Sequence, residues 1–295
     1  MKIERLAILG VGLIGGSLAM ALRRADVCDS IIGFGRNRDN LVRAKELGVI
    51  DEFSLSAKHA VKNADLVVVA TPLASNEKLF SEIAGEITPH TIVTDVGSAK
   101  ACVVEAARNT LGQHFPNFVP GHPIAGKEKS GVEAASADLF KDHLVILTPV
   151  DETNIQSLSV VTQMWESVLA EVSTLKVEHH DAVLAATSHL PHVLAYALVD
   201  CLASMNEKDE VLQYAAGGFS DFTRIASSNP QMWHDICFSN KHSLLKVLDN
   251  FNDHMNEIRK AIESNESSRL LDIFSRAKLS RDEFISKRSQ SPDSN

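Results

Sequence analysis

Three glycines near the start of the sequence have the spacing needed to bind a phosphate group. Apolar residues 5–9 precede a G-x-G-x-x-G pattern, and apolar residues then continue with helical spacing. The first glycine permits a tight turn, the second lets the backbone approach a pyrophosphate, and the third allows close packing of helix on strand. We therefore predict a dinucleotide site at the helix N-terminus, where amides and dipole favour phosphate; a turn without a ligand is the alternative. The predicted contacts are Gly10, Gly12, Leu13, Ile14 and Gly15.

The end of the second predicted strand, residues 30–35, bears on the choice of nicotinamide cofactor. In NAD enzymes an acidic residue about twenty positions after the glycines binds the ribose hydroxyls. Gly35 takes that place here, and Arg36 and Arg38 follow it. Loss of the acid and gain of arginine suit a 2′-phosphate, so NADP is favoured among NAD(P) cofactors. An Arg36 that only stacks on adenine would leave NAD, or both, in use.

Strands and helices alternate through the first part of the chain. Residues 65–70 form a continuous apolar run, typical of a parallel strand covered on both faces. The run ends in Thr71 and Pro72, at the carboxyl edge of the sheet where cofactors lie. Further strands are expected at 91–95, 144–148 and 172–177. The pattern predicts an α/β fold with a Rossmann-type doubly wound sheet.

After about residue 177 the apolar residues recur with helical spacing instead. We predict a dinucleotide-binding domain at 1–177, an all-α substrate and dimerisation domain at 178–287, and a disordered polar tail at 288–295. The helices make only a small core by themselves, so we expect them to pack between the subunits of a homodimer.

Composition excludes several classes of protein. The chain has 295 residues, a net charge of -9 and no Lys/Arg-rich block, so no nucleic-acid partner is expected. No apolar run approaches the length of a membrane span, and the N-terminus lacks the order of a secretory signal. Scattered cysteines without C-x-x-C spacing indicate a reducing compartment, so we expect a cytoplasmic protein without membrane association. The four are Cys28, Cys102, Cys201 and Cys237.

Polar side chains in the helical part could bind ligands. His189 and His192 lie three residues apart, on neighbouring positions of one helix face, and Pro191 between them should break that helix locally. No third ligand stands at a telling spacing, so no metal site is expected. The planar guanidinium of Arg224 could clamp a carboxylate, although a surface arginine is the plainer interpretation. Trp233 either walls a pocket or belongs to a helix core.

Four separated motifs together resemble the prephenate dehydrogenase family, which includes arogenate and cyclohexadienyl dehydrogenases. They are D-V-G-S at 95–98, G-H-P-I-A-G at 121–126, S-H-L-P-H at 188–192 and D-F-T-R at 221–224. The resemblance runs from residue 10 to about residue 240. It implies oxidative decarboxylation of a cyclohexadienyl dianion on the route to tyrosine, with hydride passing from the ring carbon that bears the 4-hydroxyl to the nicotinamide. Prephenate and L-arogenate both remain candidate substrates.

The resemblance also implies roles for individual residues. His122 would accept the proton of the 4-hydroxyl, as a neutral imidazole can near neutral pH, although a lone loop histidine is more often solvated or structural. Ser98 would position His122 or the substrate hydroxyl, or serve only as a helix N-cap.

Further residues would reach the substrate, three of them from the helical domain. His192 would contact it directly, while His189 would contact it or order the helix junction. Arg224 would bind a carboxylate, and Glu128 would be the gating acid. Lys127 departs from the small hydroxyl residue that some family members carry, and leaves the gating detail open.

Two other functions fit parts of the sequence. A β-hydroxyacid-type dehydrogenase shares the plan of a sheet followed by helices, but that class commonly uses a catalytic lysine in the helical domain. A nucleotide-sensing protein could keep the fold without turnover, and His122, Ser98 and Arg224 argue against it.

Overall fold

The computed structural model describes residues 2–127, 129–206, 210 and 213–290, which form two compact units, Met1–Lys241 and His242–Asn295. The first unit holds all the strands of the described structure and the helices up to α11 (Pro230–Ser239). The predicted domain boundary after residue 177 does not coincide with the division between these units and stays a prediction.

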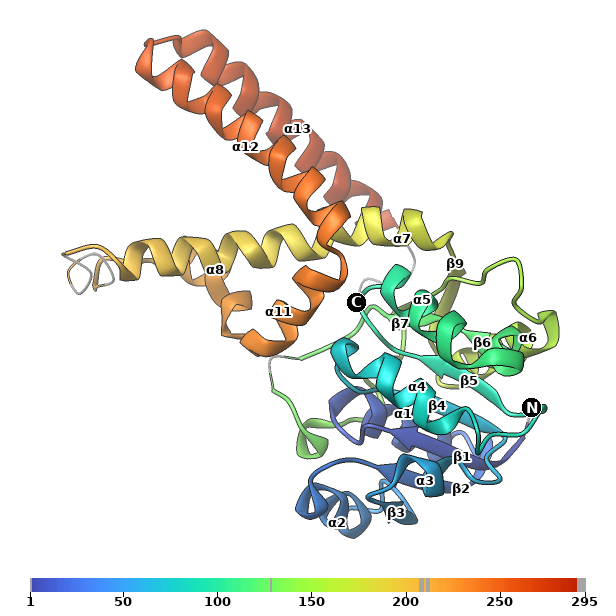
Figure 1. The fold of residues 1–295 in the computed structure, drawn as a ribbon. Coiled ribbons are helices and arrows are strands. Elements are labelled where there is room, and N and C mark those ends of the chain that lie inside the picture. Colours follow the sequence, from blue (N-terminus) through green and yellow to red (C-terminus); the bar gives the residue numbers. More distant parts are fainter. Residues whose placement is uncertain (1, 128, 207–209, 211–212, 291–295) are drawn as a thin grey trace. The chain divides into compact units, whose positions relative to one another are not determined.

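The first unit contains a six-stranded parallel sheet, as the alternation of strands and helices predicted (Figure 1). The strand order β3-β2-β1-β4-β5-β6 is that of a doubly wound dinucleotide fold. Its strands are β1 (Ile3–Leu9), β2 (Cys28–Phe34), β3 (Glu52–Ser54), β4 (Leu66–Val69), β5 (Ile92–Asp95) and β6 (Phe118–Val119).

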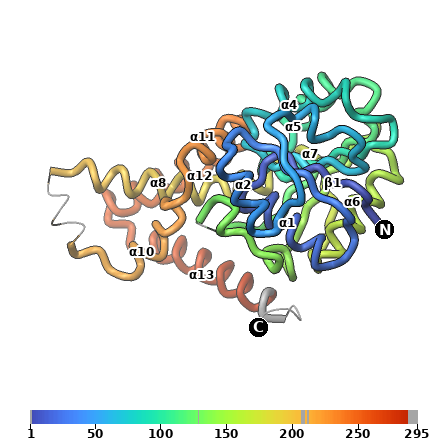
Figure 2. The backbone as a smooth tube through the Cα atoms, turned by 90° about the horizontal axis from the view of Figure 1, so that it is seen from below, coloured from blue at the N-terminus to red at the C-terminus, as the bar shows by residue number. Residues whose placement is uncertain are grey.

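Helices cover both faces of this sheet because successive strand residues point to opposite sides. Leu6 and Ile8 of β1 join the core beneath α1, α2 and α6, whereas Ala7 and Leu9 join the core beneath α3, α4 and α5. Figure 2 shows α1 on one side of β1, and α4 and α5 on the other. The helices are α1 (Leu13–Arg24), α2 (Arg38–Glu46), α3 (Ala57–Val61), α4 (Asn76–Ile83), α5 (Ala101–Thr110) and α6 (Ile155–Ser167).

A second, three-stranded sheet follows the first. It is formed by β7 (Gly121–Pro123), β8 (Leu144–Leu147) and β9 (Glu171–Thr174). β7 runs antiparallel to β8, which runs parallel to β9. His122, expected in a loop, therefore lies in the middle of a strand opposite Ile146.

A long helix leaves β9 and carries both histidines of the S-H-L-P-H motif. α7 (Val177–Leu184) continues through a π-helical turn, Ala185–His189, into α8 (Leu190–Ala203). The expected break at Pro191 does not occur. Proline lies in the first turn of α8, after the widened turn in which the Leu190 amide donates to the Ala185 carbonyl.

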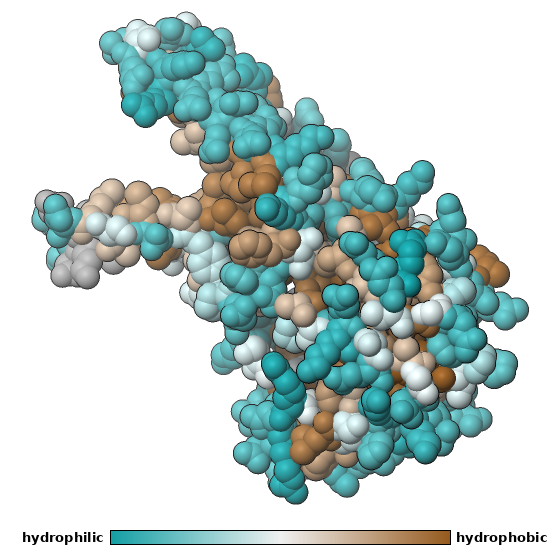
Figure 3. Space-filling view, in the orientation of Figure 1, coloured by the Kyte–Doolittle hydropathy of each residue, from teal (hydrophilic) through white to brown (hydrophobic). Residues whose placement is uncertain are grey.

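The continuous helix Val177–Ala203 contradicts the expectation that no apolar stretch approaches the length of a membrane span. Among the described residues, one helix, Val177–Ala203, is long and apolar enough to cross a membrane by length and composition. Such a helix is weak evidence for a span, and this one carries His180, Asp181 and His189, which are buried and hydrogen-bonded within the first unit. Beyond them, apolar side chains gather along the surface of α8 (Figure 3).

Two further elements complete the first unit, and two helices dominate the second. The former are α10 (Gly217–Thr223) and α11; the latter are α12 (Lys241–Glu263) and α13 (Ser267–Gln290). Arg269 of α13 pairs with Glu257 of α12 at 3.2 Å. α13 extends three residues into the predicted disordered tail, of which residues 291–295 lie outside the described part of the chain.

Candidate active site

The glycine turn has the tight geometry expected at Gly10 and Gly15, and the approach of a pyrophosphate to Gly12 stays a prediction. Gly10 has φ +110, and a Cβ there would clash with the carbonyl of Ala70 at the end of β4. Gly12 is the N-cap of α1, and no atom would obstruct a Cβ within 4 Å. Gly15 packs so closely that a Cβ would strike the Gly10 carbonyl oxygen. The first-turn amides of α1 therefore face a turn that a phosphate group can approach closely.

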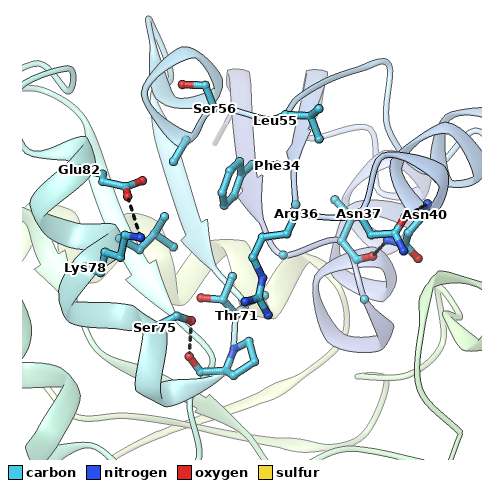
Figure 4. Close-up of a pocket in the computed structure, with 18 of the residues that line it drawn as sticks. Phe34, Arg36, Asn37, Asn40, Leu55, Ser56, Thr71, Ser75, Lys78 and Glu82 are labelled. Carbon is cyan, nitrogen blue, oxygen red and sulfur yellow. Dashed lines mark hydrogen bonds and ion pairs between the residues drawn. The ribbon is translucent and has the colours of Figure 1, made fainter.

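A cavity of about 800 Å³ opens beside this turn, at the carboxyl ends of β1, β2 and β4 (Figure 4). Five of the predicted cofactor residues line it: Gly10, Gly12, Arg36, Thr71 and Pro72. The side chain of Arg36 extends across the cavity toward Thr71. Leu13, Ile14 and Gly15 are in the first turn of α1 and are not part of the lining among the described residues.

Sequence reasoning missed several residues of this cavity. Lys78 and Glu82 of α4 form an ion pair at 3.9 Å on its far side (Figure 4). Asn40 donates from Nδ2 to the Val11 carbonyl at 2.8 Å and so fastens the glycine turn to α2. These side chains come from helices and turns without a motif, so only the fold brings them to one place.

His122 is buried at the centre of a hydrogen-bonded cluster. Its side chain is in β7, 9% of the residue is exposed, and Nδ1 lies 2.9 Å from Nε2 of His180. Burial lowers the pKa of His122 well below 6.5, and the positive charge of Lys100 adds to that effect. The ring is therefore neutral at pH 7 and able to accept a proton.

His180 is in turn held by a carboxylate. Its Nδ1 lies 2.8 Å from Oδ1 of Asp181. Asp181 also accepts from the backbone amides of Lys100 at 2.8 Å and Ala101 at 2.9 Å, at the start of α5. Burial alone would raise the pKa of Asp181, but hydrogen bonds from His180 and these amides lower it below 3.8.

A fully buried ion pair joins the strand ends beneath His122. Lys100 donates from Nζ to Oδ2 of Asp95 at 2.5 Å and to the Gly121 carbonyl at 2.6 Å. Both side chains have 0% exposure. The pair connects the end of β5 to the first residue of β7, and β5 is the neighbour of β4, whose carboxyl end borders the cavity.

Ser98 lies in the turn between Asp95 and α5, and it is not the helix N-cap. Lys100 occupies that position, and the carboxylate of Asp181 binds the free amides, so the capping interpretation of Ser98 is wrong. Ser98 is partly buried, and its backbone lies close to the ring of His189.

The geometry of His189 fits a role at the helix junction. The residue is 1% exposed, and Nδ1 lies 3.2 Å from Nδ2 of Asn240. Asn240 also donates to the Asp181 carbonyl at 2.8 Å. Burial lowers the pKa of His189 to about 4, so the ring is neutral. Nε2 is buried near the Ser98 backbone without a regular hydrogen bond.

His192 and Trp233 form a stacked pair. Their ring centroids are 3.5 Å apart with an interplanar angle of 19°. His192 Nδ1 lies 3.0 Å from the Ser188 carbonyl oxygen, which leaves Nε2 as the acceptor of the neutral ring. Burial is the largest cause that lowers the pKa of His192; the hydrogen bond to the Ser188 carbonyl raises it, and the positive charge of Arg224 lowers it further. Arg224 is exposed directly after α10 and is therefore close enough to His192 for its charge to affect that ring.

Trp233 links this pair to the cofactor side of the molecule. Trp233 is 8% exposed, and its Nε1 is buried without a hydrogen bond. Its helix, α11, packs against the 3₁₀ turn Leu73–Ser75, which directly follows Thr71 and Pro72. The burial of Trp233 agrees with the core interpretation, and its place in a pocket wall stays a prediction.

Models of two protein-family domains match most of the chain. The nucleotide-binding domain of prephenate dehydrogenase matches residues 18–174, and the prephenate dehydrogenase dimerization domain matches residues 176–276. The chain belongs to the prephenate dehydrogenase family.

Known members of this family are similar over nearly the whole chain. A cyclohexadienyl dehydrogenase of Zymomonas mobilis is 36% identical, with 94% of this chain and 95% of the relative covered. A prephenate dehydrogenase of Bacillus subtilis is 38% identical, with 95% of this chain and 76% of the relative covered. The crystal structure of A. aeolicus prephenate dehydrogenase with hydroxyphenyl propionate and NAD+ has a TM-score of 0.90 at 36% identity, covering 96% of this chain and 99% of that one.

The sequence also predicted a gating acid, Glu128, and no metal site in this protein. Glu128, the predicted gating acid, lies outside the described residues, and its neighbour Lys127 is exposed. Within the described ranges, no three His, Cys, Asp or Glu side chains gather as a metal ion would require.

Proposed function

We propose that this protein catalyses the oxidative decarboxylation of prephenate, L-arogenate or both, with hydride transfer to NAD(P), in tyrosine biosynthesis. Its family membership supports the proposal. The observation that carries it is the neutral, buried His122, held through Nδ1 next to the sheet edge that carries the dinucleotide cavity.

His122 is the proposed base. With Nδ1 engaged by His180, its Nε2 accepts the proton of the 4-hydroxyl, and the electrons of that oxygen drive hydride from the same carbon. Loss of carbon dioxide then makes the ring aromatic. When bound, the nicotinamide supplies the hydride acceptor. Ser98, in the turn at the end of β5, is the proposed hydrogen-bond partner that orients His122 or the hydroxyl.

The proposed substrate contacts are on the helices. Arg224 binds a carboxylate of the dianion, and His192 offers Nε2 from a ring held flat by Trp233. We assign His189 to the helix junction and leave Glu128 as the gating acid. The β-hydroxyacid alternative is not favoured, because the proposed site is built from His122 and His192, and the lysine beside His122, Lys100, lies outside the helical domain and is bound to Asp95.

The cavity fits a nicotinamide dinucleotide. The glycine turn and the α1 amides would hold the pyrophosphate, and residues at the end of β2 would hold the adenosine. We propose NADP as the preferred form, because Arg36 and Lys78 line the cavity and Gly35 supplies no acid to bind ribose hydroxyls.

We also propose a cytoplasmic homodimer. The matching family domain at 176–276 is described as a dimerization domain, and large apolar side chains are exposed on α13 within it. They include Leu271 at 65% and Phe274 at 55% exposure, which a second copy of the chain would cover.

The variant His122→Asn tests the proposed base. We expect kcat to fall roughly 10²–10⁴-fold, while the Kd for NADP, measured by fluorescence titration, stays within a factor of two. His143→Asn is the matched control, because His143 is an exposed histidine near the start of the neighbouring strand β8. A His122→Asn enzyme with wild-type kcat would remove His122 from the reaction.

A further inference from the structure

Three side chains form an unbroken row of hydrogen bonds that ends at the proposed base. His122 contacts His180 at 2.9 Å, and His180 contacts Asp181 at 2.8 Å. His180 is 0% exposed and Asp181 is 3% exposed, so water does not compete for these bonds. The motifs of the sequence analysis include neither residue of this pair.

The order of donors in the row follows from its acidic end. A carboxylate can only accept, so Nδ1 of His180 carries the proton donated to Asp181. The row has a consistent order of hydrogen bonds when Nε2 of His180 accepts and Nδ1–H of His122 donates to it. This leaves the lone pair of His122 on Nε2, the nitrogen that has to meet the substrate hydroxyl.

Asp181 is itself fixed in place. Its two carboxylate oxygens accept from the Lys100 and Ala101 amides at the start of α5, and Asn240 binds its backbone carbonyl. The carboxylate therefore cannot turn away from His180 without leaving two buried amides unpaired.

We propose that His180 and Asp181 are positioning residues that hold His122 in its Nδ1–H tautomer and stabilise the imidazolium formed when it takes the substrate's proton. This inference rests on the proposed function, which makes His122 the base. In the step, the O–H bond of the substrate breaks, an N–H bond forms at Nε2 of His122, and the positive charge lies one histidine away from Asp181.

The pair is needed because the other groups around His122 do not stabilise its positive charge. Lys100 is a cation, and its partner Asp95 is bound to it directly. His189 is a neutral ring at pH 7. In addition to burial, Lys100, His180 and His189 each lower the pKa of His122, so the carboxylate of Asp181, bonded to the far nitrogen of His180, is the negative charge that the row offers to an imidazolium at His122.

The tautomer of His122 can be read directly. Protein labelled with ¹⁵N-histidine gives separate NMR signals for Nδ1–H and Nε2–H rings, and the signals lost in His122→Asn identify His122 among the 12 histidines. We expect the Nδ1–H form in the wild-type protein. A wild-type His122 in the Nε2–H form would overturn the proposal without any variant.

Two substitutions at His180 separate positioning from packing. In His180→Gln the side-chain oxygen can still accept from His122 Nδ1, so we expect the tautomer to persist and kcat to fall less than tenfold. His180→Leu keeps an apolar filling but no acceptor, so we expect a mixture of tautomers and a kcat loss of roughly 10²-fold or more, with KM within threefold. His179→Leu, on the exposed face of the same helix, is the matched control.

The outcomes are distinct. If His180→Leu keeps both the Nδ1–H tautomer and wild-type kcat, His180 positions nothing and the proposal fails. If Gln and Leu lower kcat equally, the loss comes from packing, and the proposal fails again. Since the tautomer is read without substrate, a wild-type protein that shows the Nδ1–H form but turns over neither dienyl acid would contradict the proposed function and leave the hydrogen-bond row intact.

Discussion

At the scale of single residues, the site depends on burial to set protonation states. His122, His189 and His192 all have a pKa below 6.5, and burial is the largest cause in each. A histidine in this state is a poor cation and a ready hydrogen-bond acceptor. Under the proposed function, attraction of the substrate dianion therefore falls to Arg224 and not to these histidines.

The lowered pKa of His122 predicts the pH dependence of the reaction. The base is active when neutral, so kcat/KM should stay constant as the pH falls through 6.5 and decline only when the lowered pKa is reached. Protonation of His122 and His189 in the unfolded chain makes the folded state less stable below 6.5, so circular dichroism at each pH is the control. An acid limb centred above 6.5 would contradict the assigned environment.

Arg224→Ala tests the proposed carboxylate clamp. We expect KM to rise strongly, with about 3 kcal/mol of transition-state stabilisation lost in kcat/KM. Arg224→Lys keeps the charge but not the planar fork, so it should recover only part of the loss. Arg108→Ala, which removes another exposed arginine, one paired with Glu152, is the control. An unchanged KM in Arg224→Ala would exclude the clamp.

At the scale of secondary-structure elements, buried charges join strand and helix ends at one place. Asp95 ends β5, Gly121 begins β7, and the amides of Lys100 and Ala101 start α5. Lys100 binds the Asp95 carboxylate and the Gly121 carbonyl and so joins β5 to β7. The carboxylate of Asp181 in α7 binds the amides at the start of α5. His122 is thus held by contacts from four elements.

Removing Lys100 should destabilise the whole fold. In Lys100→Met the carboxylate of Asp95 stays buried without its cation, and we expect a loss of about 3–5 kcal/mol in the free energy of unfolding. Urea unfolding followed by circular dichroism measures it. The double variant Lys100→Met/Asp95→Asn should recover part of the loss. If Lys100→Met is as stable as the wild type, the pair does not hold β5 and β7 together.

Elements with a clear hydrophobic periodicity could be predicted from the sequence, whereas elements that depend on contacts between distant residues could not. The apolar run at β4 and the glycine turn were sufficient to predict the sheet, because both encode local geometry. β7 has only three residues, which is too few to show the alternation of apolar and polar residues typical of a strand, so His122 was expected in a loop. His180 and Asp181 follow Glu178 and His179 in a polar run that is typical of a solvated helix face, and only packing against α5 buries them.

At the scale of the whole molecule, the exposed apolar side chains of α13 predict that two copies of the chain form a homodimer. We expect sedimentation at micromolar concentration to give twice the 32.1 kDa of the chain. Leu271→Asp/Phe274→Asp places charges on the exposed apolar side chains of α13 and should shift the protein toward monomer. Arg276→Asp, on the same helix, is the control. A wild-type protein that sediments only as a monomer would exclude the homodimer.

The central claim is tested most directly by reduced-nicotinamide absorbance in four assays, with prephenate or L-arogenate, each with NAD or NADP. We predict turnover with at least one dienyl acid, release of one carbon dioxide per reduced nicotinamide, and a preference for NADP. A preference for NAD would mean that Arg36 only stacks on adenine. Folded protein that binds the cofactor and is silent in all four assays would contradict the proposed function and favour a nucleotide sensor or a β-hydroxyacid-type dehydrogenase.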